Sequence, residues 1–137
     1  MSRRRFYLGI LVLYLAVVAG TTLTPGPSPA DPLALRWVPF VGTYQMLVDG
    51  DSNNILAQVT GNVALFVPMG WLLPMVSPSL RQGKRRRIVL IAALASLSIE
   101  LAQLLLVSGR APAIDDVILN TSGAALGVVM FFAPRYA

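Results

Sequence analysis

Four long apolar segments constrain this chain more than any other feature of its sequence. They run over residues 6–24, 56–76, 88–107 and 114–132, with connections rich in proline, glycine and serine. Each is close to the roughly 20 residues that an α-helix needs to cross a hydrocarbon core of about 30 Å. Only 12% of the residues are charged, about half of what is usual for a soluble domain. The sequence therefore predicts an all-α, polytopic membrane protein, a four-transmembrane-helix bundle that forms a single domain over residues 1–137.

The basic residues predict how the segments are oriented. Three precede the first segment, five lie between the second and third, and one follows the fourth, which gives nine of the eleven; Arg36 and Arg110 fall on the other side. Lys and Arg are enriched in cytoplasmic loops, so we expect both termini to be cytoplasmic. Membrane topology therefore explains the net charge of +5, and we expect no nucleic acid as a partner. The block at residues 81–87 is also of a kind that attracts anionic lipid headgroups.

The N-terminus allows a second interpretation. Three arginines followed by an apolar run resemble a secretory signal, with residues 19–21 as a poor cleavage site. The apolar run is longer than the core of a usual signal peptide, which favours a membrane-spanning helix.

The chain contains no cysteine and no histidine. This excludes disulfides, thiolate chemistry, imidazole bases and the usual zinc or haem ligands. Any chemistry has to come from carboxyl, amide, hydroxyl, amine or guanidinium groups. The sequence predicts no metal site and names no cofactor.

Polar residues of the apolar segments gather at one end of the predicted bundle. With both termini inside, the second segment begins, the third ends and the fourth begins on the extracytoplasmic side. Ionisable residues within a membrane usually face the bundle interior and pair with one another. We therefore expect a polar site in this leaflet. Its candidate residues are Asn62, Glu100, Gln103, Arg110, Asp115, Asp116 and Asn120.

Several of these residues also have a structural interpretation. Asp115 and Asp116 open a helix, where a carboxylate caps free N–H groups and favours the helix dipole, so one of them could be only a cap. Asn62 and Asn120 could simply form hydrogen bonds between helices, each of which would contribute about 0.6–2 kcal/mol to stability. Glu100 lies seven residues from the end of its segment, about 10 Å deep at 1.5 Å per residue. A carboxyl group at that depth needs a partner, so a functional role is favoured for Glu100.

Small residues and prolines predict features of the packing. Gly123 and Gly127 form a G-x-x-x-G pattern, which is typical of close contact between membrane helices. We expect the partner helix to belong to the same chain. Pro68 removes a backbone donor within the second segment and predicts a kink. Pro74 is expected to shorten the cytoplasmic end of that helix.

Residues 25–55 form the only sizeable connection. Its aromatic residues, among them Trp37, Phe40 and Tyr44, suit an interfacial or re-entrant segment on the outer surface. The acidic stretch over residues 49–54 is typical of a solvated turn and lacks the full spacing of a calcium loop.

Three stretches of the sequence resemble the VanZ-like family. They are NVALFVPMG at 62–70, SIELAQ at 98–103 and RAPAIDDVILNTSGAALG at 110–127, and VPF at 38–40 is also similar to a family feature. The resemblance implies a small multi-pass protein of the bacterial cytoplasmic (inner) membrane. The founding member of that family is associated with low-level resistance to the glycopeptide teicoplanin. The family pattern selects the same seven polar residues and implies no catalytic ones; residues 111–113 are less polar than the pattern would suggest.

Two functions fit these observations best. The first is binding or handling of a cell-envelope amphiphile, such as a lipid-linked precursor or a glycopeptide, with an effect on teicoplanin susceptibility. Its head would meet the polar cluster and its tail would lie among membrane lipids between the segments. The alternative is an intramembrane enzyme whose carboxylates hold a hard cation or act as acid and base on a lipid-linked phosphate. A helper that stabilises a membrane partner is a third reading, and the oligomeric state is not predicted.

Overall fold

The computed structural model describes residues 2–23, 38–107 and 113–133. These residues form helices without any β-strand. The helices are α1 (Arg3–Thr22), α2 (Val41–Val48), α3 (Ser52–Val76), α4 (Pro78–Arg81), α5 (Arg85–Leu106) and α6 (Ile114–Phe132). Four of them, α1, α3, α5 and α6, are long and apolar enough to cross a membrane. The predicted all-α, four-span architecture is confirmed.

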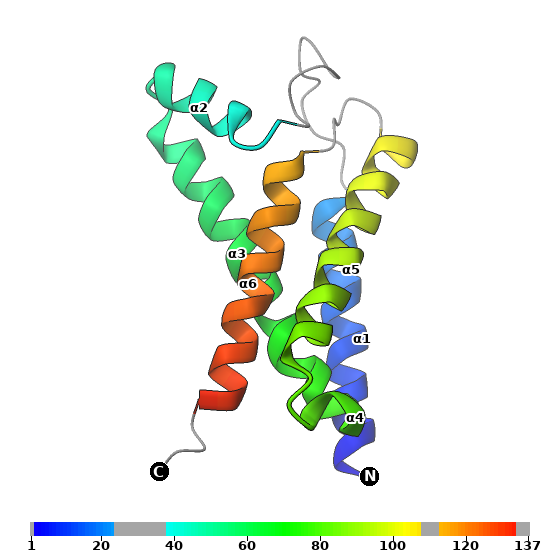
Figure 1. Cartoon of the computed structure of the whole chain (residues 1–137). Coiled ribbons are helices and arrows are strands. Elements are labelled where there is room, and N and C mark those ends of the chain that lie inside the picture. Colours follow the sequence, from blue (N-terminus) through cyan, green and yellow to red (C-terminus); the bar gives the residue numbers. More distant parts are fainter. Residues whose placement is uncertain (1, 24–37, 108–112, 134–137) are drawn as a thin grey trace.

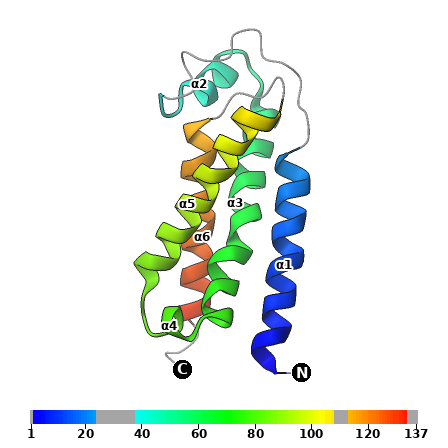
Figure 2. The ribbon, with the colours of Figure 1, turned by 90° about the vertical axis from the view of Figure 1, so that its right-hand side faces the viewer.

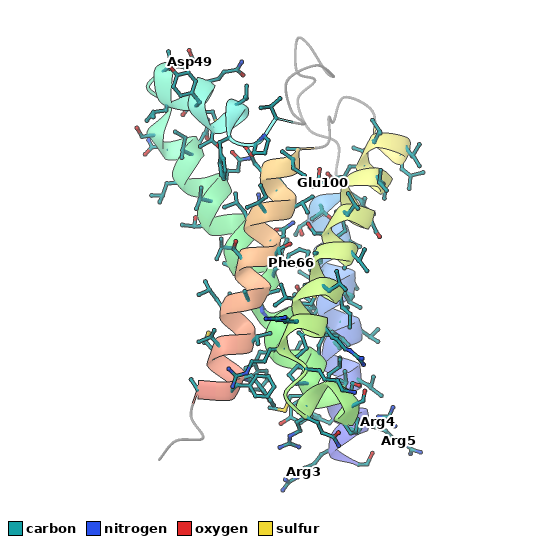
Figure 3. All side chains as sticks on the ribbon, in the orientation of Figure 1. Arg3, Arg4, Arg5, Asp49, Phe66 and Glu100 are labelled. Carbon is teal, nitrogen blue, oxygen red and sulfur yellow. The ribbon has the colours of Figure 1, made fainter. Side chains whose placement is uncertain are left out.

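The four long helices stand side by side in one bundle (Figures 1 and 2). α1 begins and α6 ends at the same end of this bundle, and the short helix α2 lies across the opposite end (Figure 1). Arg3, Arg4 and Arg5 mark the first end, whereas Glu100 lies toward the second (Figure 3). That the first end faces the cytoplasm is still a prediction from the basic residues. Arg36, Arg110 and Arg135 lie outside the described residues.

Three of the long helices begin before their apolar segments do. The hydroxyl of Ser2 caps α1 by accepting a hydrogen bond from the N–H of Arg5 at 3.4 Å. α3 begins at Ser52 rather than at residue 56, and the basic residues at 85–87 form the first turn of α5. Polar flanks are invisible to a hydropathy pattern, but they continue a helix readily where water satisfies its terminal N–H groups.

The outer connection contains a helix that the sequence pattern did not separate from its loop. α2 lies across the end of the bundle instead of re-entering between the spans (Figures 1 and 2). Its aromatic residues Phe40 and Tyr44 are 55% and 66% exposed, which suits contact with a membrane–water interface. Trp37 lies outside the described residues.

Both prolines of the second segment lie inside one continuous helix, α3. The expectation that Pro74 shortens this helix is wrong, because α3 runs on to Val76. The N–H of Ser77 still bonds to the carbonyl of Leu73 at 3.1 Å. Pro74 is fully buried, and membrane helices tolerate proline where neighbouring helices surround the altered backbone.

The most extensive interface in the bundle joins α3 and α6. A Cβ atom added to Gly123 would overlap the carbonyl oxygen of Val63, and one added to Gly127 would overlap that of Val67. On the facing helix, Gly70 lies equally close to the backbone of α6. The predicted close contact of the G-x-x-x-G pattern is therefore confirmed, and its partner is internal.

The other helices pack around this pair. α5 lies against α6, and α1 packs mainly on α3. α1 is the least embedded span, since Val18 is its only buried residue. Two side chains attach it to α3: the Tyr14 hydroxyl donates to the carbonyl of Leu65 at 2.7 Å, and Arg4 Nε donates to that of Val76 at 3.2 Å.

The glycine contact yields a stability prediction with an internal control. Gly127→Ala should lower the thermal unfolding midpoint in detergent, because overpacking a tight interface costs about 1–3 kcal/mol. Gly61→Ala, on the same pair of helices, adds a Cβ with nothing within 4 Å. It should leave the midpoint unchanged or raise it, because alanine is favoured over glycine within a helix by up to about 1 kcal/mol. Equal midpoints for the two variants would contradict the close α3–α6 contact.

The orientation can be tested with single cysteines, because the chain has none of its own. Asp49 and Gln82 are both exposed and lie in the connections at opposite ends of α3. A membrane-impermeant maleimide should label Asp49→Cys in intact spheroplasts, and Gln82→Cys only after permeabilisation. The reverse pattern would show that the termini are extracytoplasmic.

Candidate functional site

Among the described residues, five buried polar side chains occupy the half of the bundle that α2 covers. Each is at most 5% exposed. Buried polar groups need hydrogen-bond partners, so their contacts define how this end is built. The five are Ser96, Glu100 and Gln103 on α5 and Asp115 and Asn120 on α6. Two half-buried residues, Asn62 and Asp116, complete the polar cluster.

Asp115 attaches α2 to the bundle. Its carboxylate accepts a hydrogen bond from the backbone N–H of Phe40 at 2.6 Å and one from the hydroxyl of Thr43 at 3.1 Å. Phe40 is the N-cap residue of α2 and has a left-handed backbone with φ of 66°. The carboxylate therefore meets the positive end of the α2 dipole, where an anion is favourable. Asp115 caps a neighbouring helix.

Asp116, the next residue, points to a different helix. Its Oδ1 atom accepts hydrogen bonds from Asn62 Nδ2 at 2.6 Å and from Gln58 Nε2 at 3.0 Å. Gln58 and Asn62 are four residues apart on α3 and so share one face of it. One carboxylate oxygen thus holds two successive turns of α3 against the start of α6.

Glu100 stabilises the start of α6 from α5. Its Oε2 atom accepts a hydrogen bond from the N–H of Ala113 at 2.9 Å. Ala113 is the N-cap residue of α6, and its own side chain provides no cap. We expected one of the two aspartates to cap this helix, but their hydrogen-bond partners lie on α2 and α3. A carboxylate from a neighbouring span caps α6 instead.

Two carboxamides form the remaining contacts of the cluster. Gln103 Nε2 donates to the carbonyl of Thr22 at 2.7 Å and so joins α5 to the end of α1. Asn120 Nδ2 donates to the hydroxyl of Ser96 at 2.9 Å in the buried centre of the α5–α6 interface. The other end of that amide, Oδ1, is buried and has no hydrogen-bond partner among the residues that the structure describes. Such a group is a candidate site for a water molecule or a ligand donor.

Six of the seven predicted site residues lie in the described chain, all at this end of the bundle. Arg110 lies outside the described residues. In the described hydrogen bonds, Glu100, Asp115 and Asp116 accept from donors on different elements. Among the residues that the structure describes, no three acidic side chains could hold a metal ion together.

Sequence reasoning left three contributors out of its candidate set. Gln58 shares a helical face with Asn62, and this i, i+4 spacing is a signal that could have included it. Ser96 precedes Glu100 by one turn on the same face of α5, a similar signal. Thr43 carried no such signal, because its role depends on how α2 folds back onto α6.

The space beside Asp115 is small. A cavity of about 40 Å³ is lined by Gly42, Met46, Gln58, Ala113 and Asp115. A water molecule has a share of about 30 Å³ of the liquid. This cavity therefore has room for a few water molecules at most and none for a lipid headgroup.

A larger groove runs beside the cluster, between α1 and α5. Its volume is about 290 Å³. Its walls are mostly apolar and include two hydroxyl-bearing residues, Thr22 and Ser98; α1 contributes Leu15, Val18 and Thr22, and α5 contributes Ala95, Ser98 and Ala102. The groove lies on the apolar face of α5, and Glu100 and Gln103 belong to the buried face of that helix. Apolar space and buried polar groups thus lie at the same depth.

Comparison with known proteins identifies the family. The model of the VanZ/LLP1 family matches residues 11–135, which is nearly the whole chain. No curated protein and no solved structure gives a significant match. The chain therefore belongs to the VanZ/LLP1 family, as a membrane protein with four spanning helices.

Proposed function

We propose that this protein binds an amphiphile of the bacterial cell envelope at the α2 end of the bundle, on the extracytoplasmic face of the inner membrane. The amphiphile's chain lies in the groove between α1 and α5, and its head meets the polar cluster at the upper edge. The observation that carries the proposal is the position of this groove directly beside buried polar residues of α5.

The dimensions of the groove suit a lipid chain. Ala95 and Ala102 line it along α5, and the seven steps from one to the other correspond to about 10 Å at 1.5 Å per residue. Half of a hydrocarbon core is about 15 Å thick, so the groove follows most of one leaflet. α1, which forms the other wall, buries only Val18, and a weakly embedded wall favours entry of a chain sideways from the bilayer.

Burial energetics favour a role for the cluster beyond stability. Burying a carboxylate costs several kcal/mol even after relaxation. A hydrogen bond to a charged group contributes about 1.5–3 kcal/mol, so the two bonds of Asp115 come close to balancing that cost. Apolar residues would hold these helices together at least as well. The polar residues are therefore better explained by recognition of a polar ligand.

The available groups favour a head rich in hydroxyl or amide groups. The upper edge of the groove carries Thr22, whose hydroxyl donates to the carbonyl of Val18 at 2.7 Å and whose carbonyl accepts from Gln103. Glu100 lies on the adjoining face of α5. Hydroxyl, amide and carboxyl groups suit sugars and peptides. The cavity under α2 is too small for such a head, so we propose that the head lies at the open edge. A lipid-linked envelope precursor has this chemistry, and so does a lipoglycopeptide such as teicoplanin.

A binding module is preferred over an intramembrane enzyme. The enzyme would need carboxylates gathered around one metal or one proton. In the described chain these carboxylates bind N–H and hydroxyl donors on separate elements.

Filling the groove tests the position of the chain. Ala102→Phe places a ring in the α1–α5 groove and should reduce the co-purifying amphiphile about tenfold or more, as expected for a loss of at least 1.4 kcal/mol. Native mass spectrometry of the protein released from detergent measures this. Ala16→Phe is the matched control, since Ala16 is an exposed α1 residue that lines neither this groove nor any other described cavity. Equal retention by the two variants would contradict the proposed position.

Neutral isosteres test the role of the polar cluster. In Glu100→Gln and Asp116→Asn a side-chain oxygen still accepts the observed hydrogen bonds, so the unfolding midpoint should change little. If charge recognises the ligand, both variants should lose the bound amphiphile and any effect of expression on teicoplanin susceptibility. Asp49→Asn, at an exposed turn, is the control. If both variants insert, fold and behave like wild type in both assays, the polar cluster does not recognise the ligand.

A further inference from the structure

We propose that a second groove, between α5 and α6 at the opposite end of the bundle, binds one acyl chain of an anionic phospholipid whose phosphate contacts Arg85 and Arg86. This site is separate from the proposed amphiphile site in both position and charge. It rests on the shape of the groove, on the two arginines at its mouth and on the distribution of acidic residues.

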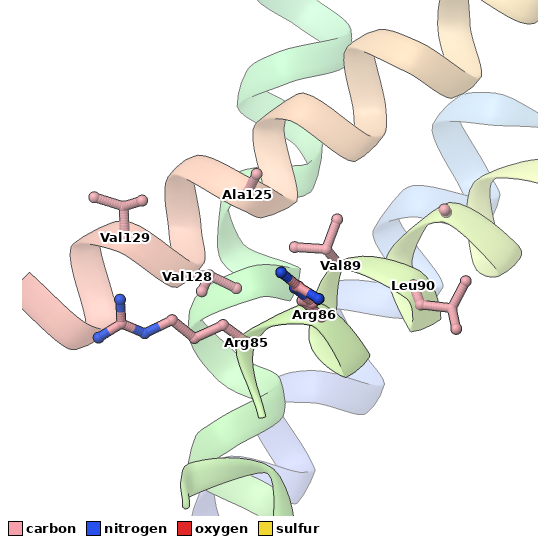
Figure 4. Close-up of a pocket in the computed structure, with 8 residues that line it drawn as sticks. Arg85, Arg86, Val89, Leu90, Ala125, Val128 and Val129 are labelled. Carbon is pink, nitrogen blue, oxygen red and sulfur yellow. The ribbon is translucent and has the colours of Figure 1, made fainter. Parts of the chain in front are cut away.

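The groove is large and its walls are apolar. Its volume is about 480 Å³, within the range of about 300–1,000 Å³ that is typical of ligand sites. α5 contributes Val89, Leu90 and Ala93, and α6 contributes Ala125, Val128 and Val129 (Figure 4). From Arg85 to Ala93 the groove extends about 12 Å along α5 at 1.5 Å per residue. That is most of the roughly 15 Å of one leaflet's hydrocarbon layer.

Arg85 and Arg86 supply charge at one end of this apolar wall (Figure 4). The guanidinium carbon of Arg85 lies 4.9 Å from the centre of the Phe132 ring. This cation–π contact directs Arg85 toward α6, and its N–H groups, which lie in the plane of the guanidinium, suit phosphate oxygens. An apolar groove that ends in two cations complements an anionic headgroup attached to a fatty chain.

Nothing negative in the described chain opposes an anion at this position. Asp49 and Glu100 lie toward the α2 end (Figure 3), Asp51 precedes α3 at that same end, and Asp115 and Asp116 bind groups on α2 and the first half of α3. The basic connection around α4 adds Arg81 and Arg87 to the same end of the bundle. These two residues raise the local positive potential but do not line the groove. Substituting them therefore distinguishes direct contact with the lipid phosphate from general electrostatic attraction.

The test is binding of defined lipids to the purified full-length chain, measured by native mass spectrometry. Dioleoyl phosphatidylglycerol is the probe and dioleoyl phosphatidylcholine is its neutral comparison. Wild type should bind one phosphatidylglycerol more tightly than phosphatidylcholine. Arg85→Gln/Arg86→Gln should weaken phosphatidylglycerol roughly thirtyfold, because each basic residue near an anionic lipid contributes roughly fivefold. Ala93→Phe, which fills the groove without changing charge, should weaken both lipids.

Controls separate the outcomes. Arg81→Gln/Arg87→Gln removes the same charge outside the groove and should weaken phosphatidylglycerol far less than the Arg85/Arg86 pair. An equal loss in the two pairs, or normal binding by a correctly folded Ala93→Phe variant, would overturn the site. A dimer that Ala93→Phe abolishes would also overturn it, because a second copy would then fill the groove. Ala102→Phe should lose the amphiphile of the first groove and keep phosphatidylglycerol, so the two proposals can fail independently.

Discussion

The close backbone contact between α3 and α6 is the constraint on which the rest of this structure depends. Lipid chains are as apolar as leucine, so membrane helices associate through tight packing and hydrogen bonds instead of the hydrophobic effect. Gly123 and Gly127 meet Val63 and Val67 with the same spacing in the same direction, which makes α3 and α6 parallel neighbours. That register brings the start of α6 beside Gln58 on α3. The polar end of the bundle therefore follows from its glycine-rich interface.

Much of this architecture is predictable from the sequence, because lipid imposes simple rules. Segment length fixes four spans, and the spacing of Gly123 and Gly127 identifies a packing face. The polar residues near three segment ends converge because adjacent spans alternate in direction. Pro74 was misread because isolated-helix rules treat proline as a terminator, whereas a buried position in a bundle tolerates it.

The partners of the carboxylates were not predictable in the same way. Asp115 binds the N–H of Phe40, a backbone group that is available only because Phe40 adopts a left-handed conformation at the start of α2. Glu100 binds the N–H of Ala113 on the next span. No sequence spacing records either contact, since both depend on how separate elements meet. What the sequence identifies is the set of side chains, and what the fold decides is which donor each one receives.

Two grooves on α5 give the bundle different surfaces at its two ends. The one beside Glu100 combines apolar walls with the hydroxyl-bearing residues Thr22 and Ser98, whereas the one beside Arg85 combines apolar walls with positive charge. A density map of the protein in nanodiscs of native lipid tests the central proposal most directly. The proposal predicts chain-like density between α1 and α5, with a head at Thr22 and Gln103. Direct packing of α1 on α5, with no density between Leu15 and Ala102, would contradict it.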